Sequence, residues 1–186
     1  MSSRFTVLKA RLHIADIDRG YYGDHVLTLA HHPSETDERV AMRLLAFILQ
    51  ASPQLALARG LTEEDEPDLW EKDAIGDIRL WVEVGLPDPK RIRKACTRAQ
   101  SVLIYSYGGR AAHVWWETHR DKLEALQNLT VLEVPAQVSQ ALAALVQRTM
   151  TLNGTIQDDQ IWIADDKTSV TVALDVRKAG ARPQRS

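Results

Sequence analysis

Apolar and polar residues alternate at both ends of the chain, a pattern typical of β-strands with one buried face. Near the amino end the alternation runs from Phe5 to Ile17 and again from Asp24 to Ala30, with Asp18-Arg19-Gly20 between the two stretches. A polar segment that ends in glycine favours a tight turn, so we expect a β-hairpin here. Near the carboxyl end three short stretches predict a meander, over residues 150–156, 161–164 and 170–176.

Helical and extended patterns alternate in the middle of the chain. Apolar residues spaced three and four apart predict a helix that begins with Ser34 as its N-cap and ends near Gln50. Asp88 followed by Pro89 predicts the start of a second helix, because aspartate caps free N–H groups and proline is tolerated in the first turn. Further strands are predicted over residues 69–72, 78–84, 102–105 and 129–134, and further helices over 111–126 and 138–146. This alternation predicts a mixed α/β class, with a parallel or mixed sheet and additional antiparallel strands at both ends of the chain.

The composition is that of one globular protein, with 186 residues of which 45% are hydrophobic and 26% charged. We expect a single domain over residues 1–176 and a basic, disordered tail over 177–186. The amino end lacks a signal-peptide pattern and no apolar run is long enough for a membrane helix, so we expect a cytoplasmic protein without a membrane partner. The net charge of −2 disfavours holding long nucleic acid by bulk charge but allows a local basic patch.

Three carboxylates occupy positions that are unusual for surface residues. Glu38 falls on the apolar stripe of the first helix, where a charge is costly unless it is paired; the alternative is a solvated place in the first turns. Glu83 ends a strand that leads into a helix, where open α/β sheets bind ligands, and its alternative is an ion pair with Arg79. Asp68 shares the face of Glu83 if the hairpin turn has four residues, and lies on the opposite face if it has three.

Two basic segments are candidates for phosphate contacts. Arg91 and Arg93 belong to a run of basic residues on the Asp88 helix, for which the alternative is a solvated charged face. Arg110 follows Gly108-Gly109 at the start of another helix, where free N–H groups favour anions.

Several longer segments form recognisable motifs: His32-Pro33-Ser34-Glu35-Thr36, Arg59-Gly60-Leu61, Asp65-Glu66-Pro67, Leu80-Trp81-Val82-Glu83-Val84-Gly85-Leu86-Pro87-Asp88, Lys94-Ala95-Cys96, Trp115-Trp116 and Arg148-Thr149-Met150-Thr151-Leu152. Together they resemble one known family, YaeQ, over residues 5 to 176. The order of a helix glutamate, a hairpin aspartate and a second strand carboxylate also resembles the PD-(D/E)XK nuclease superfamily, to which YaeQ is similar. The resemblance implies a restriction-endonuclease-like core.

The same resemblance implies a catalytic site. Asp68 and Glu83 would bind Mg²⁺ or Mn²⁺, with Glu38 as a third ligand or as the group that orients water, for phosphodiester hydrolysis of DNA or RNA. The lysine of the motif would stand at position 85, which is glycine, so the resemblance implies that Lys90 or Lys94 supplies it. The competing interpretation is a non-catalytic module on a nuclease-like fold that binds nucleic acid or a protein whose identity the sequence does not give.

Overall fold

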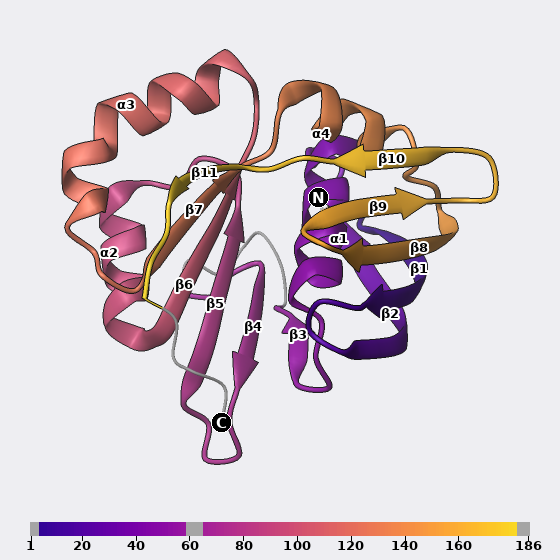
Figure 1. Cartoon of the computed structure of the whole chain (residues 1–186), viewed down its shortest axis with the longest axis horizontal. Helices are drawn as coiled ribbons and strands as arrows, with labels where there is room; N and C mark the ends of the chain where they lie inside the picture. Colours follow the sequence, from indigo (N-terminus) through magenta and orange to yellow (C-terminus); the bar gives the residue numbers. More distant parts are fainter. Residues whose placement is uncertain (1–3, 59–64, 182–186) are drawn as a thin grey trace. The chain divides into compact units, whose positions relative to one another are not determined.

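The computed structural model describes residues 4–58 and 65–181, which contain four helices and eleven strands in two mixed sheets (Figure 1). The predicted mixed α/β class is therefore confirmed. The chain divides into two compact units, one formed by Met1–Pro53 with Gln137–Ala173 and the other by Gln54–Ala136 with Leu174–Ser186. The single domain over residues 1–176 stays a prediction beside this division. Each unit is described by itself below.

The first unit contains a five-stranded sheet with the order β10-β9-β8-β1-β2 (Figure 1). β1 (Thr6–Asp16) pairs antiparallel with β2 (Tyr21–His31) along its whole length, which confirms the predicted hairpin. β8 (Thr149–Gln157), β9 (Gln160–Ala164) and β10 (Ser169–Val172) form the predicted meander. β8 also pairs in parallel with β1, so strands from the two ends of the chain share one sheet.

The first helix, α1 (Asp37–Gln50), begins later than the sequence pattern indicated. Its N-cap is Thr36, whose Oγ1 accepts the N–H of Arg39 at 3.1 Å, and the prediction of Ser34 is wrong. The N–H of Glu35 donates to the His32 carbonyl at 2.9 Å, which closes a turn over the preceding residues. Ser34 is held within that turn, and helical geometry starts only after it.

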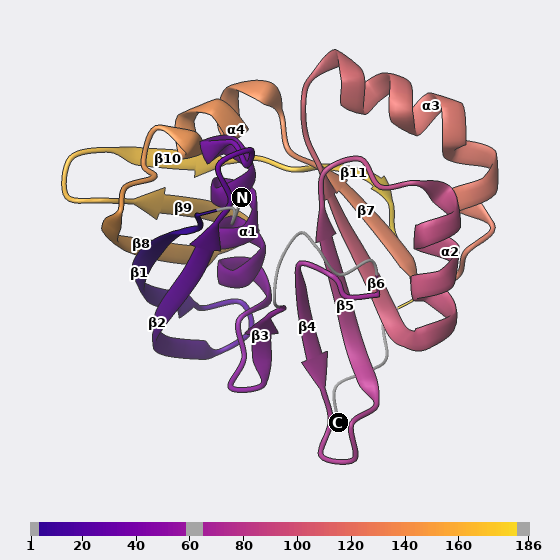
Figure 2. The same ribbon diagram turned by 180° about the vertical axis from the view of Figure 1, so that it is seen from behind.

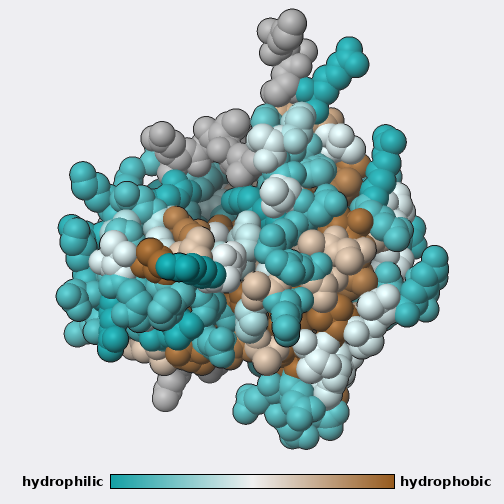
Figure 3. Space-filling model, turned by 90° about the horizontal axis from the view of Figure 1, so that it is seen from above, coloured by the Kyte–Doolittle hydropathy of each residue, from teal (hydrophilic) through white to brown (hydrophobic). Residues whose placement is uncertain are grey.

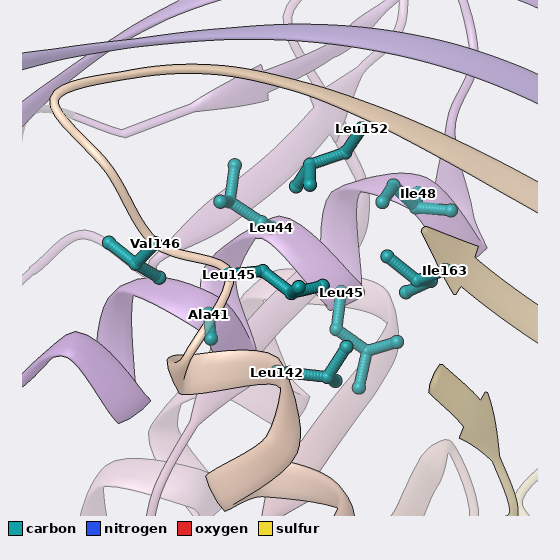
Figure 4. Close-up of a pocket in the computed structure, with 9 residues that line it drawn as sticks. All are labelled: Ala41, Leu44, Leu45, Ile48, Leu142, Leu145, Val146, Leu152 and Ile163. Carbon is teal, nitrogen blue, oxygen red and sulfur yellow. The ribbon is translucent and has the colours of Figure 1, made fainter. Parts of the chain in front are cut away.

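α1 and α4 (Ala136–Ala143) contribute side chains to the apolar core of the first unit (Figure 4). Leu45 from α1 and Leu142 from α4 face Leu152 of β8 and Ile163 of β9 around a cavity of about 10 Å³. A space of this size holds one water at most, and apolar walls keep such spaces dry. The cavity is therefore a packing defect of the core and no ligand site.

The second unit contains a six-stranded sheet with the order β11-β7-β6-β5-β4-β3 (Figure 2). Its centre is parallel, as predicted, and consists of β5 (Ile78–Val84), β6 (Ala99–Ser106) and β7 (Leu129–Glu133). Its flanks are antiparallel and consist of β3 (Leu55–Leu57), β4 (Leu69–Lys72) and β11 (Asp175–Lys178). α2 (Pro89–Arg98) and α3 (Arg110–Glu124) supply residues such as Ile92 and Trp116 to a buried cluster with Trp81 of β5.

The predicted strand over residues 170–176 is two strands in the structure. β10 ends at Val172, and β11 begins at Asp175 and pairs with β7 in the other sheet. Arg177 and Lys178, which composition assigned to the tail, belong to β11 because both find partners on β7. Arg177 forms an ion pair with Glu133, and Lys178 Nζ donates to a β7 carbonyl at 3.0 Å. Residues 182–186 of the predicted tail lie outside the described residues.

The surface seen in Figure 3 is largely hydrophilic, with hydrophobic residues in small patches between polar ones. The most exposed large hydrophobic side chains are Ile75, at the tip of the β4–β5 hairpin, and Val26 and Tyr22 on β2. In the described part of the chain, no helix is long and apolar enough to cross a membrane.

Candidate functional site

β4 and β5 bring two of the predicted carboxylates together. Leu69, the first residue of β4, pairs with Val82, so Asp68 lies next to the end of β5 that contains Glu83, and the charge of Asp68 acts on the Glu83 carboxyl. The Asp68 side chain continues the ladder, because its Oδ2 accepts the N–H of Val84 at 2.8 Å while its own N–H donates to the Val82 carbonyl at 3.0 Å. These two hydrogen bonds hold Asp68 beside Glu83, and the face that the two side chains would share stays a prediction.

An irregularity in the hairpin produces this arrangement. Lys72 pairs with Ile78 across the turn, but Glu71 pairs with Leu80, so β5 carries one extra residue at a bulge. Since successive residues of a strand point to opposite faces, one extra residue reverses the face of everything that follows. Without the bulge, the pairing at the turn would place Leu69 opposite Trp81 in place of Val82 and shift the approach of Asp68 by one residue. The bulge thus sets the geometry of the candidate site, and turn length alone could not predict it.

Glu83 is a buried carboxylate whose two oxygens differ. Arg91 Nε donates to Oε1 at 2.5 Å, whereas Oε2 is buried and has no hydrogen-bond partner among the described residues. Burial raises the pKa of Glu83, the guanidinium of Arg91 opposes this rise, and the nearby charge of Asp68 adds to it; the pKa is raised overall. Trp81 Nε1 lies near enough to favour the charged form but not in hydrogen-bond geometry.

The basic residues of α2 hold the segment that leads into Asp68. Arg91 Nη2 donates to the Glu66 carbonyl at 2.6 Å, and Arg98 Nη1 donates to the Asp65 carbonyl at 2.7 Å. Lys94 Nζ forms an ion pair with Asp65 Oδ1 at 2.7 Å. Positions 91, 94 and 98 are three and four residues apart, so they share one face of the helix. This face of α2 binds groups of the chain itself. Lys94 pairs with the exposed carboxylate of Asp65 and makes no ion pair with the buried carboxylate of Glu83.

The other predicted cations are exposed. Lys90 lies in the first turn of α2, where its backbone N–H donates to Asp88 Oδ1 at 2.8 Å, which confirms Asp88 as the N-cap. Arg93 is exposed on the same helix. Arg110 is the exposed first residue of α3, after Gly109, whose φ of 62° favours glycine. The roles of Lys90, Arg93 and Arg110 stay predictions.

Glu38 belongs to the first unit, whereas Asp68 and Glu83 belong to the second. It is half-buried on α1, and its Oε1 accepts the hydroxyl of the buried Ser139 of α4 at 2.6 Å. This hydrogen bond accounts for a charge on an apolar stripe, and the sequence gave no signal for it because the two residues are 101 positions apart. A place for Glu38 in the metal site stays a prediction.

A three-ligand metal cluster is absent among residues 4–58 and 65–181, where no group of three or more His, Cys, Asp or Glu side chains is arranged to hold an ion. The pair Asp68 and Glu83 nevertheless suits Mg²⁺, which usually keeps several waters and uses one or two carboxylates together with substrate oxygens. The Oε2 atom of Glu83 is a hard oxygen donor without a partner among the described residues. The residues present therefore fit a magnesium ion that takes two ligands from this unit.

Comparison with known proteins places the whole fold in one family. Residues 1–174 match the YaeQ protein family. The chain belongs to the YaeQ family. The uncharacterised YaeQ proteins of Escherichia coli K12 and Salmonella typhi are each 44% identical to it over 174 residues, which are 94% of this chain and 96% of each relative. The predicted family membership is therefore confirmed.

Two crystal structures of YaeQ proteins share the fold. The protein from Xanthomonas axonopodis pv. citri superimposes with a TM-score of 0.90 at 48% identity, over 95% of this chain and 99% of that one. The protein from Pseudomonas syringae superimposes with a TM-score of 0.89 at 34% identity, over 94% and 97%. The two-sheet arrangement described above is thus the YaeQ fold.

Proposed function

We propose that this YaeQ protein hydrolyses phosphodiester bonds of DNA or RNA with the help of Mg²⁺ or Mn²⁺ held by Asp68 and Glu83. One observation carries the proposal: Asp68, just before β4, is hydrogen-bonded beside Glu83 of β5, and one buried oxygen, Glu83 Oε2, has no partner among the described residues. Leaving a buried polar group unpaired costs about 1–3 kcal/mol, and more when the group is charged. A divalent cation would offset that cost, which supports a metal at this point.

The chain's own residues would divide the work as follows. A bound ion would supply polarisation of the scissile phosphate and acidification of a water. Val84 N–H orients the Asp68 carboxylate, and Arg91 orients that of Glu83. Arg91 forms an ion pair with Glu83, so we assign to it the charge-stabilising role expected of Lys90 or Lys94.

The proposal includes a relationship to the PD-(D/E)XK nucleases and a restriction-endonuclease-like core. Three features support them: a strand hairpin with two acidic residues, a following helix with basic residues, and parallel strands beside the hairpin. Glu38 as a third ligand belongs here as well. Fold alone does not transmit activity, so the proposal depends on the carboxylate pair and not on the relationship.

The test is a cleavage assay with the full chain on single-stranded DNA, duplex DNA and RNA, with Mg²⁺ or Mn²⁺. Glu83→Gln keeps the shape of the side chain and removes the charge that a hard cation needs, so we expect a loss on the order of 100-fold or more. Glu133→Gln is the matched control, because Glu133 is also a buried glutamate paired with an arginine at the end of a strand in the same sheet. The control should cleave as the wild type does. Equal residual cleavage by wild type and Glu83→Gln would refute the proposal.

A non-catalytic binding module is the second candidate, and a specific observation favours it. The cation paired with Glu83 is an arginine already engaged with the Glu66 carbonyl, and position 85 is a glycine. No lysine forms an ion pair with Glu83 within residues 4–58 and 65–181. Such a protein would bind its partner without cleaving it, and wild type and Glu83→Gln would then be equally inactive in the same assay.

A further inference from the structure

The sheet of the first unit has one face that its helices do not cover. Even-numbered residues of β1 and β8 face α1; a Cβ at Gly154, for example, would come within 2.5 Å of Ile48 Cγ2. Odd-numbered residues of the same strands lie on the opposite face, because side chains alternate along a strand. Lys9, Arg11 and His13 on this face are all exposed.

The strand register arranges the exposed face in four rows. The rows are Thr28–Lys9–Thr149, Val26–Arg11–Thr151, Asp24–His13–Asn153 and Tyr22–Ala15–Thr155–Trp162. The first two rows contain the cations, flanked mostly by threonine hydroxyls. The last row has an aromatic ring on each side of two small residues. The face therefore changes along β1 and β8 from a basic end to an aromatic end.

A hollow of about 380 Å³ lies over the last two rows. The small side chain of Ala15 leaves its floor low, the backbones of Gly23 and Gly154 line it, and Tyr22, which is 65% exposed, stands at its side. His13 Nδ1 and Asp24 Oδ1 are 2.7 Å apart at its edge, so each fixes the orientation of the other. A ring held largely in water beside polar groups is suited to stacking on a flat ligand.

The two cations of this face have no acidic partner within the described ranges. The carboxylate of Asp24 is paired with His13, and neither Lys9 nor Arg11 forms an ion pair among residues 4–58 and 65–181. On this face the unpaired cations are followed by the exposed ring of Tyr22 and the half-buried ring of Trp162. Cations followed by accessible aromatic rings are the combination with which proteins bind single-stranded nucleic acid, through phosphates and stacked bases respectively. A duplex would offer the phosphates but not the base faces.

We infer that this face binds single-stranded nucleic acid, with phosphates at Lys9 and Arg11 and bases stacked on Tyr22 and Trp162. Residues two apart on a strand are about 6.7 Å apart, which is comparable to the spacing of successive phosphates in an extended single strand. The local patch overcomes the slight negative charge of the whole chain only at short range, so binding weakens as salt rises. The inference does not rest on the proposed hydrolysis, although it would name the substrate of that reaction as single-stranded.

The test is fluorescence anisotropy of the full chain with a short labelled oligonucleotide of mixed sequence, as single-stranded DNA, single-stranded RNA and duplex DNA. EDTA is present throughout, so the result does not depend on metal or cleavage. Tyr22→Ala should weaken single-strand binding at least about fivefold, the lower end of the cost of losing one base–aromatic stack, whereas Tyr22→Phe keeps the ring and should bind as the wild type does. The double variant Lys9→Gln with Arg11→Gln should bind more weakly than Tyr22→Ala, and its affinity should depend less steeply on salt concentration.

Lys122→Gln is the charge-matched control, since it removes an exposed lysine from α3 in the other unit. The replaced side chains are all exposed, so thermal unfolding should be unchanged in each variant. Loss of binding in Tyr22→Ala and in the double variant, with retention in Tyr22→Phe and Lys122→Gln, supports the inference. Failure of the wild type to bind any oligonucleotide, equal binding by all variants, or a preference for the duplex would overturn it. If the wild type cleaves nucleic acid in the metal-dependent assay but these variants bind as it does, the proposed hydrolysis stands and the proposed role of this face fails.

Discussion

The Glu83 carboxylate has a different environment at each oxygen, and this difference defines the candidate site. Oε1 is paired with Arg91, and Oε2 is buried without a partner among the described residues. The sequence could indicate Glu83 and Asp68 as candidates because both stand at strand ends of one predicted hairpin, but it left the face of Asp68 open. It could not indicate the pairing with Arg91 in place of a lysine, because that depends on how α2 lies over the sheet.

The raised pKa of Glu83 gives the stability a defined pH dependence. Since the folded-state pKa lies above its ordinary value of 4.5, the protonated carboxyl stabilises the fold at low pH, and this contribution is lost as pH rises through the folded-state pKa. Glu83→Gln mimics the neutral form at every pH. The free energy of unfolding of Glu83→Gln should therefore increase relative to that of the wild type as pH rises towards neutrality.

Urea unfolding of both proteins, followed by tryptophan fluorescence over a pH series without divalent metal, measures this difference. All other titrating groups are common to the two proteins and cancel in the comparison. A difference that stays constant with pH, or that shrinks as pH rises, would mean that the pKa of Glu83 is not raised in the folded chain.

At the scale of single elements, local capping signals predicted one helix start correctly and the other incorrectly. Asp88 caps α2, and the following proline leaves no alternative start nearby. Ser34 and Thr36 are both good N-cap residues, and only the turn from His32 to Glu35 decides between them. The bulge in β5 escaped prediction for a related reason, because no residue type marks it.

The capping assignment predicts an asymmetry between two alanine variants. Thr36→Ala removes the acceptor of the Arg39 N–H and should lower the free energy of unfolding by about 1 kcal/mol. Ser34→Ala removes a hydroxyl that hydrogen-bonds to the half-buried His32 side chain within the turn, and should cost less, about 0.5 kcal/mol or under. Urea unfolding of the two variants and the wild type measures these losses. Equal losses, or a larger loss for Ser34→Ala, would contradict the assignment of Thr36 as the N-cap.

At the scale of the whole molecule, alternation of helices and strands predicted the class, and the pairing of distant segments escaped prediction. Phe5 to Ile17 and residues 150–156 both show a strand pattern, but nothing local states that β1 and β8 pair in parallel. Likewise, the step from β10 to β11 carries the chain from one sheet to the other within three residues. Such pairings depend on contacts across long sequence separations, which periodicity does not encode.

Metal binding is the property of the whole chain that separates a metal-dependent enzyme from a binding module. A ligand that binds only the folded chain stabilises it by about 2.7 kcal/mol at one hundred times its Kd, and each kcal/mol raises the Tm of a chain of this size by about 2–4 °C. Saturating Mg²⁺ or Mn²⁺ should therefore raise the Tm of the wild type by several degrees. Glu83→Gln should lose most of this shift, because it removes a charged oxygen ligand.

Thermal unfolding with and without each metal, in the wild type, Glu83→Gln and Glu133→Gln, makes the measurement. Glu133→Gln should keep the full shift, since Glu133 is paired with Arg177 and lies outside the proposed pair. Ca²⁺ serves as a further arm, because a site built for Mg²⁺ geometry accepts the larger ion less well. A shift of equal size in all three proteins would mean that the metal binds elsewhere, and no shift in the wild type would favour the binding module, in which Arg91 alone balances the buried carboxylate.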